Sequence, residues 1–326
     1  MEMEYRRLGK SGLQVSALSF GSWVTFGGQV NDDTAKSCLY TAYDHGVNFF
    51  DNAEAYAGGK SEQVMGKILK EAGWSRDTFI VSSKVFWGGK LPNQTGLSRK
   101  HVMEACEAAL RRLQVDYLDL YFCHRPDPQT PIEETVRAMH SIVESGKALY
   151  WGTSEWEAAD ILEAISIAER HHLHKPIVEQ PVYNLFEQHR FAADYDAVYK
   201  EQGYGSTTWS PLASGVLTGK YRKGIPKDSR GALKGYEWLQ QGLLDEQRQA
   251  VVERLEPIAS DMGASLAQFS LAWCLQNPSV SSVITGASRV SQVHENMKAL
   301  EFVDQFTPER MAAIDTALAG GVPRLT

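Results

Sequence analysis

Cysteine is scarce in this sequence, and the few cysteines lie far apart. There are four in 326 residues, with no C-x-x-C pair that would suit a zinc site or a redox motif. A chain of this length can bury a large core and does not need a disulfide scaffold to fold. We therefore expect four buried free thiols, at Cys38, Cys106, Cys123 and Cys274.

Long apolar runs and a surplus of positive charge are also absent. No stretch approaches the ~18 apolar residues of a membrane span, and the opening segment MEMEYRRLGKSGLQVS lacks the apolar core of a signal peptide. Lys and Arg number 33 against 40 Asp and Glu, for a net charge of −7, whereas non-specific nucleic-acid binders are usually basic. The sequence therefore predicts a cytoplasmic protein with no membrane insertion and no nucleic-acid partner.

What the sequence does contain is a repeated alternation of short β-rich runs with longer helical runs. The helical runs carry apolar residues at three- and four-residue spacing, as over 99–113, 132–146 and 157–172. The β-rich runs cover 15–23, 46–52, 78–85, 117–124, 147–154, 176–184, 206–212 and 281–288. Because these runs are nearly continuous in apolar residues, they are typical of parallel strands buried on both faces.

Eight such units predict an α/β fold, specifically a (β/α)8 TIM barrel. A doubly wound parallel sheet is the main alternative, but the count of eight and the absence of a linker favour the closed barrel. We expect one domain over residues 1–326, with extra C-terminal helices. The segment 4–16, which has a glycine between polar residues, is expected to form an N-terminal β-hairpin that covers the bottom of the barrel.

Polar or aromatic residues stand at the end of each predicted strand. In a (β/α)8 barrel the C-terminal strand ends form the mouth where chemistry takes place. A single polar residue in such a position is more often a turn former or a solvated tip. Four candidates converging on one mouth are harder to explain in that way, and here they are Asp51, Tyr56, Lys84 and His124.

These four side chains can together protonate a developing alkoxide. Lys84 follows the apolar run FIVSS, so its ammonium needs a partner, and Asp51 on the neighbouring strand can supply one. A free phenol has a pKa of about 10, and a nearby ammonium is expected to lower that of Tyr56. A histidine at the same mouth can donate a hydrogen bond to a substrate oxygen. The set suits reduction of a carbonyl group, where charge develops on oxygen.

Carbonyl reduction needs a hydride, which no side chain carries, so a nicotinamide cofactor is implied. No G-x-G-x-x-G follows a strand, and GYGSTT (203–208) breaks that pattern. The barrel mouth itself would therefore hold the cofactor. Ser154 and Gln180 are candidates for the carboxamide, and Trp209 is a candidate platform for the nicotinamide ring.

The phosphate groups of such a cofactor have candidates further along the chain. Residues 210–220, which include Gly215, supply backbone amides for a pyrophosphate, and 286–296 opens a helix whose N-terminus suits a phosphate. Lys220, Arg230 and Arg289 are cations suited to a 2′-phosphate. These cations favour NADPH over NADH.

Long motifs in the sequence resemble the aldo-keto reductases, in particular the branch that contains the β subunits of voltage-gated potassium channels. They include GSWVTFGGQ (21–29), FDNAEAYAGGKSE (50–62), SSKVFWGGK (82–90), RPDPQTPIEETVRAM (125–139), YWGTSEW (150–156) and TWSPLASGVLTGKY (208–221). The resemblance extends over about residues 5 to 303.

The resemblance implies the barrel, NADPH/NADP+ as cofactor, and Asp51, Tyr56, Lys84 and His124 as the catalytic tetrad, with the tyrosine as proton donor. The cofactor residues that it implies are Trp23, Gln29, Ser154, Gln180, Trp209, Ser210, Leu212, Lys220, Arg230, Gly286, Ser288, Gln292, Glu295 and Asn296. It also suggests a homo-oligomer, a tetramer or larger. Trp87, in the FWGGK loop after Lys84, is expected in the substrate pocket, although core packing is an equal alternative.

One departure from the family pattern bears on function. Animal channel β subunits have Asn where this chain has His124, so this chain keeps a full reductase tetrad. The barrel is also expected to begin almost at Met1, without the long N-terminal inactivation segment of those subunits. We therefore expect an enzyme acting on a small-molecule carbonyl substrate.

Two other functions stay open at this stage: an NADP(H)-binding redox-sensing regulatory protein with slow turnover, and a barrel enzyme acting on sugars or phosphates without nicotinamide. We expect no metal site. The histidine-rich HHLH (171–174) is interpreted as a helix end.

Overall fold

Eight parallel strands close into a barrel in the computed structural model, which describes residues 2–319. The strand order around the barrel is β10-β3-β4-β5-β6-β7-β8-β9. Their bounds are β3 Leu18–Gly21, β4 Phe49–Asp51, β5 Ile80–Val85, β6 Leu118–Cys123, β7 Ala148–Thr153, β8 Val178–Glu179, β9 Gly205–Thr208 and β10 Ser282–Thr285. The predicted (β/α)8 barrel is confirmed.

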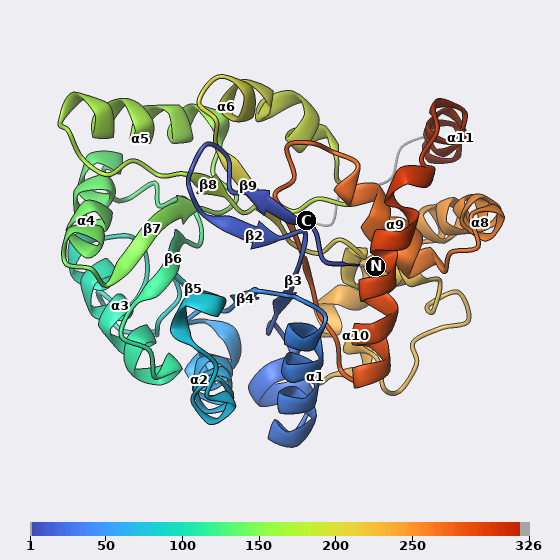
Figure 1. Cartoon of the computed structure of the whole chain (residues 1–326), viewed down its shortest axis with the longest axis horizontal. Coiled ribbons are helices and arrows are strands. Elements are labelled where there is room, and N and C mark those ends of the chain that lie inside the picture. The colour runs from blue at the N-terminus through green and yellow to red at the C-terminus, as the bar shows by residue number, and fades with distance from the viewer. Residues whose placement is uncertain (1, 320–326) are drawn as a thin grey trace.

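Helices surround the barrel, as Figure 1 shows. They are α1 Asp32–Asp44, α2 Lys60–Ala72, α3 Arg99–Leu113, α4 Ile132–Glu144, α5 Ala158–Arg170, α6 Asp196–Lys200, α7 Gln240–Leu243, α8 Glu246–Asp261, α9 Leu266–Leu275, α10 Val290–Met297 and α11 Pro308–Leu318. Of the expected extra C-terminal helices, α11 comes after the eighth strand and its helix and packs against α8, and a 3-10 segment, Lys298–Gln305, precedes it. Short 3-10 and π turns fill several of the connections.

The sequence explains where these helices begin and end. In α3, the Ser98 side chain accepts a hydrogen bond from the backbone N–H of His101 and caps the first turn. Its buried residues recur at helical spacing, from Val102 to Leu113, and face the barrel. α4 begins directly after Pro131, which fits the first turn of a helix because its missing N–H would have no partner there.

The N-terminal hairpin closes one end of the barrel. β1 (Tyr5–Arg7) pairs antiparallel with β2 (Gln14–Ser16), and Figure 1 shows β2 lying across the barrel in the foreground. Leu8 and Val15 are fully buried and belong to the apolar cluster inside the barrel, together with Phe49 and Leu120. The predicted lid is therefore confirmed, and it leaves the opposite end of the barrel, at the C-terminal strand ends, as the only mouth among the described residues.

Some predicted strands are shorter than expected. The run 176–184 forms a regular strand only at Val178–Glu179. Pro181 has no N–H to donate, and beyond it Val182 makes an isolated bridge to Trp209. The run 15–23 is divided, since Ser16 ends the hairpin and the barrel strand begins at Leu18. Over 206–212, regular pairing stops at Thr208.

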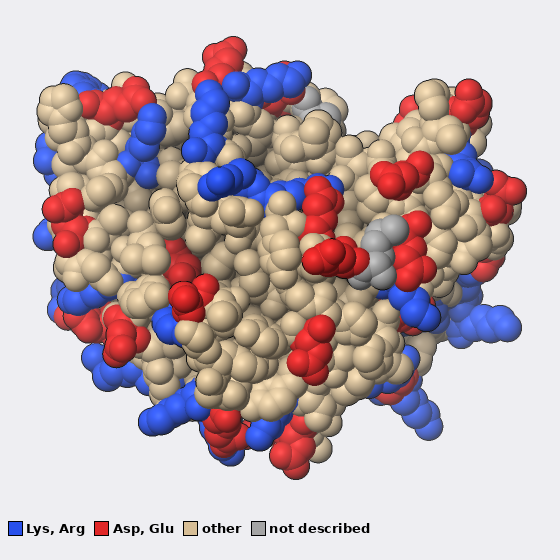
Figure 2. All heavy atoms as spheres, in the orientation of Figure 1, with Lys and Arg blue, Asp and Glu red and all other residues tan. Residues whose placement is uncertain are grey.

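The predictions from amino-acid composition concerned the cysteines, the surface charge and membrane-spanning segments. Cys38, Cys106, Cys123 and Cys274 are all free and buried, as predicted. Lysines and arginines are interspersed with aspartates and glutamates on the face seen in Figure 2, which gives no large basic patch there. None of the helices between residues 2 and 319 is long and apolar enough to cross a membrane.

Candidate active site

Lys84 lies at the centre of a buried polar cluster inside the barrel. Its side chain has no solvent exposure, and its ammonium donates three hydrogen bonds. They go to Oδ2 of Asp51 at 2.6 Å, to the backbone carbonyl of Asn52 at 2.8 Å and to the Tyr56 hydroxyl oxygen at 3.0 Å. An ammonium has three N–H donors, so every one is used. Burial opposes the charged form, but Asp51 and Tyr56 outweigh it and raise the pKa of Lys84.

Asp51, the last residue of β4, is held on both carboxylate oxygens. Besides the Lys84 bond to Oδ2, its Oδ1 accepts from the Ser82 hydroxyl at 2.8 Å and from the Gln180 side-chain amide at 3.1 Å. β4 and β5 are adjacent, with Asp51 paired to Ser82 in register. The strand pairing therefore brings the carboxylate and the ammonium together, as the sequence predicts.

Tyr56 begins a short turn just beyond β4 and lies against Lys84. Its pKa is raised, because burial disfavours the phenolate more than Lys84 favours it. The sequence predicts that the ammonium lowers the pKa of Tyr56, and Lys84 does act in that direction, but burial makes the net shift upward. The opposing effect of Lys84 is present but smaller. The phenol therefore keeps its proton at neutral pH, which is the form that a proton donor requires.

His124 directly follows β6 and lies beside Tyr56. Its ring centroid lies 5.8 Å from that of Tyr56 and 5.0 Å from that of Trp87. Burial, then the charges of Lys84 and Arg125, hold its pKa well below the usual value, so the imidazole is neutral. Its Nδ1 is buried and has no hydrogen-bond partner within the described part of the chain. A neutral imidazole can donate from one ring nitrogen to a substrate oxygen.

A large cavity of about 1310 Å³ opens at this end of the barrel. Asp51, Tyr56 and His124 line it, whereas Lys84 lies behind them and reaches the cavity through Tyr56. Every residue predicted for the cofactor or the substrate also lines it, namely Trp23, Gln29, Trp87, Ser154, Gln180, Trp209, Ser210, Leu212, Gly215, Lys220, Arg230, Gly286, Ser288, Arg289, Gln292, Glu295 and Asn296.

The inner part of the cavity has an aromatic and amide lining. Trp23 and Trp209 meet edge to face, with ring centroids 6.1 Å apart. The Ser154 hydroxyl donates to the backbone carbonyl of Gln180 at 2.8 Å. Because the Gln180 amide also donates to Asp51, this side chain links the predicted carboxamide site directly to the tetrad.

The outer part of the cavity concentrates positive charge. Arg230 lies over the Trp23 ring at 4.8 Å. Burial, then repulsion from Arg230 and Arg289, lowers the pKa of Lys220. Asp228 opposes this charge in part, since it meets Arg289 at 3.4 Å with both side chains largely exposed and also acts on Lys220. Three cations that line the same cavity, with one exposed carboxylate described beside them, fit a phosphate group, so the residues present suit an anionic dinucleotide.

Comparison with known proteins identifies the family. The aldo/keto reductase family model matches residues 17–319. This chain belongs to the aldo/keto reductase family.

Two relatives of this aldo/keto reductase carry the same name, "Probable voltage-gated potassium channel subunit beta". The protein from Arabidopsis thaliana is 55% identical over 307 residues, which cover 94% of each chain. The protein from Oryza sativa subsp. japonica is 53% identical over 317 residues, which cover 97% of each chain. The resemblance to the channel-subunit branch is thus confirmed at the level of sequence similarity.

Two side chains of this aldo/keto reductase site were not singled out in the sequence. Glu155 directly follows Ser154, and its carboxylate accepts from the Trp209 indole N–H at 2.9 Å and from Arg190 at 2.8 Å. It therefore fixes the orientation of the predicted nicotinamide platform. Arg125 directly follows His124 and lines the cavity. Their positions next to predicted residues at strand ends were a usable signal for both.

Left-handed backbone is concentrated at the mouth. Non-glycine residues with positive φ include Val24 (70°), Ala57 (50°), Glu155 (59°), Ser210 (55°) and Ser214 (56°). Val24 and Ala57 directly follow residues that line the cavity, and the other three line it themselves. Such conformations cost about 1–3 kcal/mol each and persist only where the surroundings impose them. Their clustering here is typical of a functional site.

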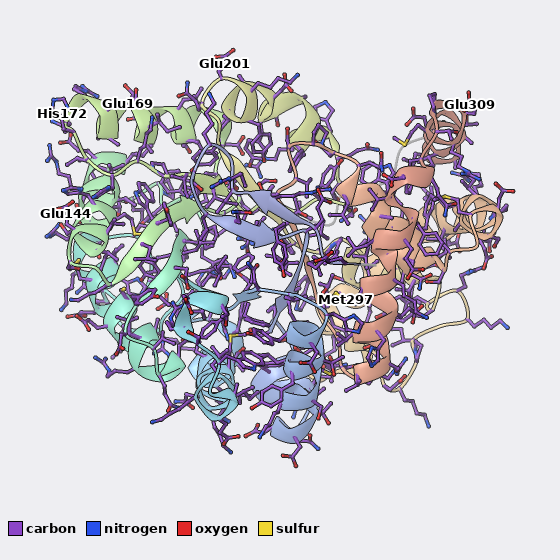
Figure 3. All side chains as sticks on the ribbon, viewed as in Figure 1. Glu144, Glu169, His172, Glu201, Met297 and Glu309 are labelled. Atoms are coloured by element: carbon purple, nitrogen blue, oxygen red, sulfur yellow. The ribbon has the colours of Figure 1, made fainter. Side chains whose placement is uncertain are left out.

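One group of possible metal ligands occurs among residues 2–319, formed by His140, Glu144 and His174. The His174 ring and the Glu144 carboxylate form a hydrogen bond of 2.6 Å. Figure 3 shows Glu144 on α4 at the outer edge of the molecule. None of the three residues lines the cavity, so they take no part in the candidate active site.

Proposed function

We propose that this aldo/keto reductase reduces aldehydes and ketones to alcohols with NADPH, with Tyr56 as the proton donor. The observation that carries the proposal is the direction of the hydrogen bond between Lys84 and Tyr56. Because the ammonium donates and the phenol oxygen accepts, the O–H of Tyr56 is left to face the cavity.

The residues lining the cavity fit the proposed cofactor. Trp209, Ser154 and Gln180 would hold the nicotinamide end, and the cations Lys220, Arg230 and Arg289 would hold the phosphates, which favours NADP(H) over NAD(H). When bound, NADPH supplies the hydride that no side chain can provide.

The chain's own residues would handle the proton and the substrate oxygen. His124, neutral and buried, donates an N–H to the carbonyl oxygen and orients it. Tyr56 transfers its proton to that oxygen as negative charge develops. Lys84 then stabilises the resulting phenolate, and Asp51 holds the ammonium in place. Trp87, whose ring contacts the His124 ring edge to face, forms a wall of the substrate pocket.

The proposal is tested by NADPH oxidation with a panel of small aldehydes and ketones. We expect turnover with NADPH, weaker turnover with NADH, and loss of turnover in Tyr56→Phe. Tyr5→Phe is a matched control, because that hydroxyl only donates to the Gly46 carbonyl on the surface. No turnover in the wild type with any carbonyl compound would contradict the proposal.

A second candidate function is that of an NADP(H)-binding, redox-sensing regulatory protein with slow turnover. The names of the two relatives, as probable channel β subunits, favour it. It predicts that the cofactor co-purifies with the protein and that its oxidation by aldehydes is slow even in a single turnover. Rapid multiple turnover with release of NADP+ would oppose it.

The location, domain organisation and assembly of the protein are also proposals. We propose a cytoplasmic protein acting on small-molecule carbonyl compounds as a single domain over residues 1–326, of which 1 and 320–326 lie outside the described residues. A homo-oligomer, tetramer or larger, is proposed from the similarity to the channel subunits. Light scattering of the purified protein measures the assembly directly, and a monomer would contradict it.

A further inference from the structure

The geometry points to Arg125 as a binding site for an anionic group on the substrate, so that carbonyl compounds bearing a carboxylate are the preferred substrate class. This inference rests on the proposed function. It concerns a residue that the tetrad does not use and that stands in the same cavity.

The first observation is that the Arg125 guanidinium lacks an anionic partner. One of its nitrogens donates to the backbone carbonyl of His124 at 2.6 Å and to the Ser154 hydroxyl at 3.4 Å. Among residues 2–319 no carboxylate lies within ion-pair distance of it. A guanidinium has five N–H donors in a planar fork that matches a carboxylate, and most of them are free here.

The second observation is that two aromatic rings hold this guanidinium in place. It lies 5.4 Å from the centre of the Trp87 ring and 5.9 Å from that of Trp209. Contacts of this kind fix the plane of an arginine without neutralising its charge. The side chain is half-buried, so an anion that reached it would be partly shielded from water.

The third observation is the distance to the reacting groups. The Trp87 ring contacts both groups, 5.0 Å from the His124 ring and 5.4 Å from the Arg125 guanidinium, so these two are separated by at most the sum of those distances. The positive charge of Arg125 acts on both His124 and Tyr56. A carbonyl held by His124 and Tyr56 can therefore belong to a small molecule whose other end is a carboxylate on Arg125.

The inference is tested with 4-formylbenzoate and its neutral counterpart, methyl 4-formylbenzoate. Both present the same aldehyde, and only one presents a carboxylate. We compare the ratio of their kcat/KM values in the wild type, in Arg125→Met and in Arg125→Lys. Since the two compounds differ in intrinsic reactivity, the readout is the change of this ratio between variants. Any effect of the substitution on His124 or Tyr56 cancels in it.

We expect Arg125→Met to lower the ratio about 10- to 100-fold, as for loss of a hydrogen-bonded ion contact. Arg125→Lys keeps the charge but loses the planar fork, so its ratio falls less. Arg137→Met is the matched control, because Arg137 lies on the exposed face of α4 and pairs with Glu133. An unchanged ratio in Arg125→Met overturns the inference, and the turnover itself then still supports the proposed function.

A binding measurement decides the inference even without turnover. Quenching of tryptophan fluorescence by the two formylbenzoates gives their Kd values directly, with Trp87 and Trp209 as nearby reporters. We expect the Kd of 4-formylbenzoate, and not that of the ester, to rise about 10- to 100-fold in Arg125→Met. Equal Kd values in both proteins overturn the inference. A loss of NADPH affinity with an unchanged formylbenzoate Kd also overturns it, because Arg125 would then serve the cofactor.

Discussion

The Lys84 ammonium donates a hydrogen bond of 3.0 Å to the Tyr56 hydroxyl oxygen. Its other two N–H groups are taken by Asp51 and by the carbonyl of Asn52, so it cannot rotate away without leaving a partner unsatisfied. The phenol thus sits with its oxygen toward a fixed positive charge and its proton toward the cavity. This arrangement suits an acid that is needed only when charge develops on the substrate.

The buried pair of Lys84 and Asp51 should matter for stability. We expect Lys84→Met to lower the free energy of unfolding by about 3–5 kcal/mol, because it leaves the Asp51 carboxylate buried without a counter-charge. The double variant Lys84→Met/Asp51→Asn should lose less than the sum of the two single variants. Urea unfolding measures all four proteins.

Lys36→Met is the control for this experiment, since Lys36 pairs with Glu71 on the surface and should contribute little. Additive losses in the double variant would contradict a coupled pair.

The pH dependence of carbonyl reduction follows from Tyr56 and His124. Burial raises the pKa of Tyr56 above its ordinary value, and that of His124 is held well below its ordinary value. The reactive form, with a protonated phenol and a neutral imidazole, should persist from about pH 6 to about pH 9. We expect a flat single-turnover rate over that range, a fall in more alkaline solution as Tyr56 ionises, and a fall in more acidic solution as His124 is protonated. A rate that falls with increasing pH, with a midpoint near neutrality, would instead indicate that the charge of Lys84 outweighs burial and lowers the pKa of Tyr56.

A second buried carboxyl, Glu179 in β8, should make stability depend on pH. Burial and then the charge of Glu155 raise the pKa of Glu179 to about 8, despite a hydrogen bond from Thr153. The unfolded chain releases this proton near the ordinary glutamate pKa of 4.5, whereas the folded chain keeps it until about pH 8. The folded state therefore binds more protons in this window, and stability falls as pH rises through it.

We expect the contribution of Glu179 to fall by up to ~1.4 kcal/mol per pH unit between those two pKa values. Glu179→Gln removes the titration, so its stability relative to the wild type should improve with increasing pH. Urea unfolding at a series of pH values compares the two proteins. Parallel pH dependences would show that Glu179 is not protonated in the folded state.

The cations Lys220, Arg230 and Arg289 should make the protein bind NADPH more tightly than NADH. We expect Lys220→Met to raise the Kd for NADPH about 10-fold and to leave that for NADH unchanged, because only NADPH carries the extra phosphate. Fluorescence titration at fixed salt measures both. Lys223→Met is the control, since Lys223 is exposed on the same connection and does not line the cavity. An equal rise in the Kd values for NADPH and NADH would contradict this prediction and indicate that Lys220 contacts the pyrophosphate, which both cofactors carry.

The barrel could be predicted because its signal is repeated along the chain. Eight apolar runs alternate with amphipathic helices, and each run places its last polar residue at one mouth, as with Asp51 and His124. Strand length was less predictable. The apolar character of 176–184 suggested a full strand, but the regular strand covers only Val178–Glu179, and pairing beyond Pro181 is limited to an isolated bridge between Val182 and Trp209.

The electrostatic balance and the supporting contacts could not be predicted. The sequence places Lys84 near Tyr56, but only the burial of the phenol shows that desolvation outweighs the ammonium. The position of Glu155 next to Ser154 was a usable signal for its place in the site, but its hydrogen bond to Trp209 could not be predicted, because it joins two strand ends that are distant in sequence. Positive φ at Val24, a β-branched residue, has no signal in the sequence, since tertiary contacts impose it.

The most direct test of the account is the single-turnover rate of NADPH oxidation by an aldehyde in Tyr56→Phe, with NADPH affinity measured in parallel. If Tyr56 is the proton donor, the rate should fall about 10²- to 10⁴-fold while the Kd for NADPH is unchanged. A rate equal to that of the wild type, in a variant that binds NADPH normally, would show that the proton comes from another group.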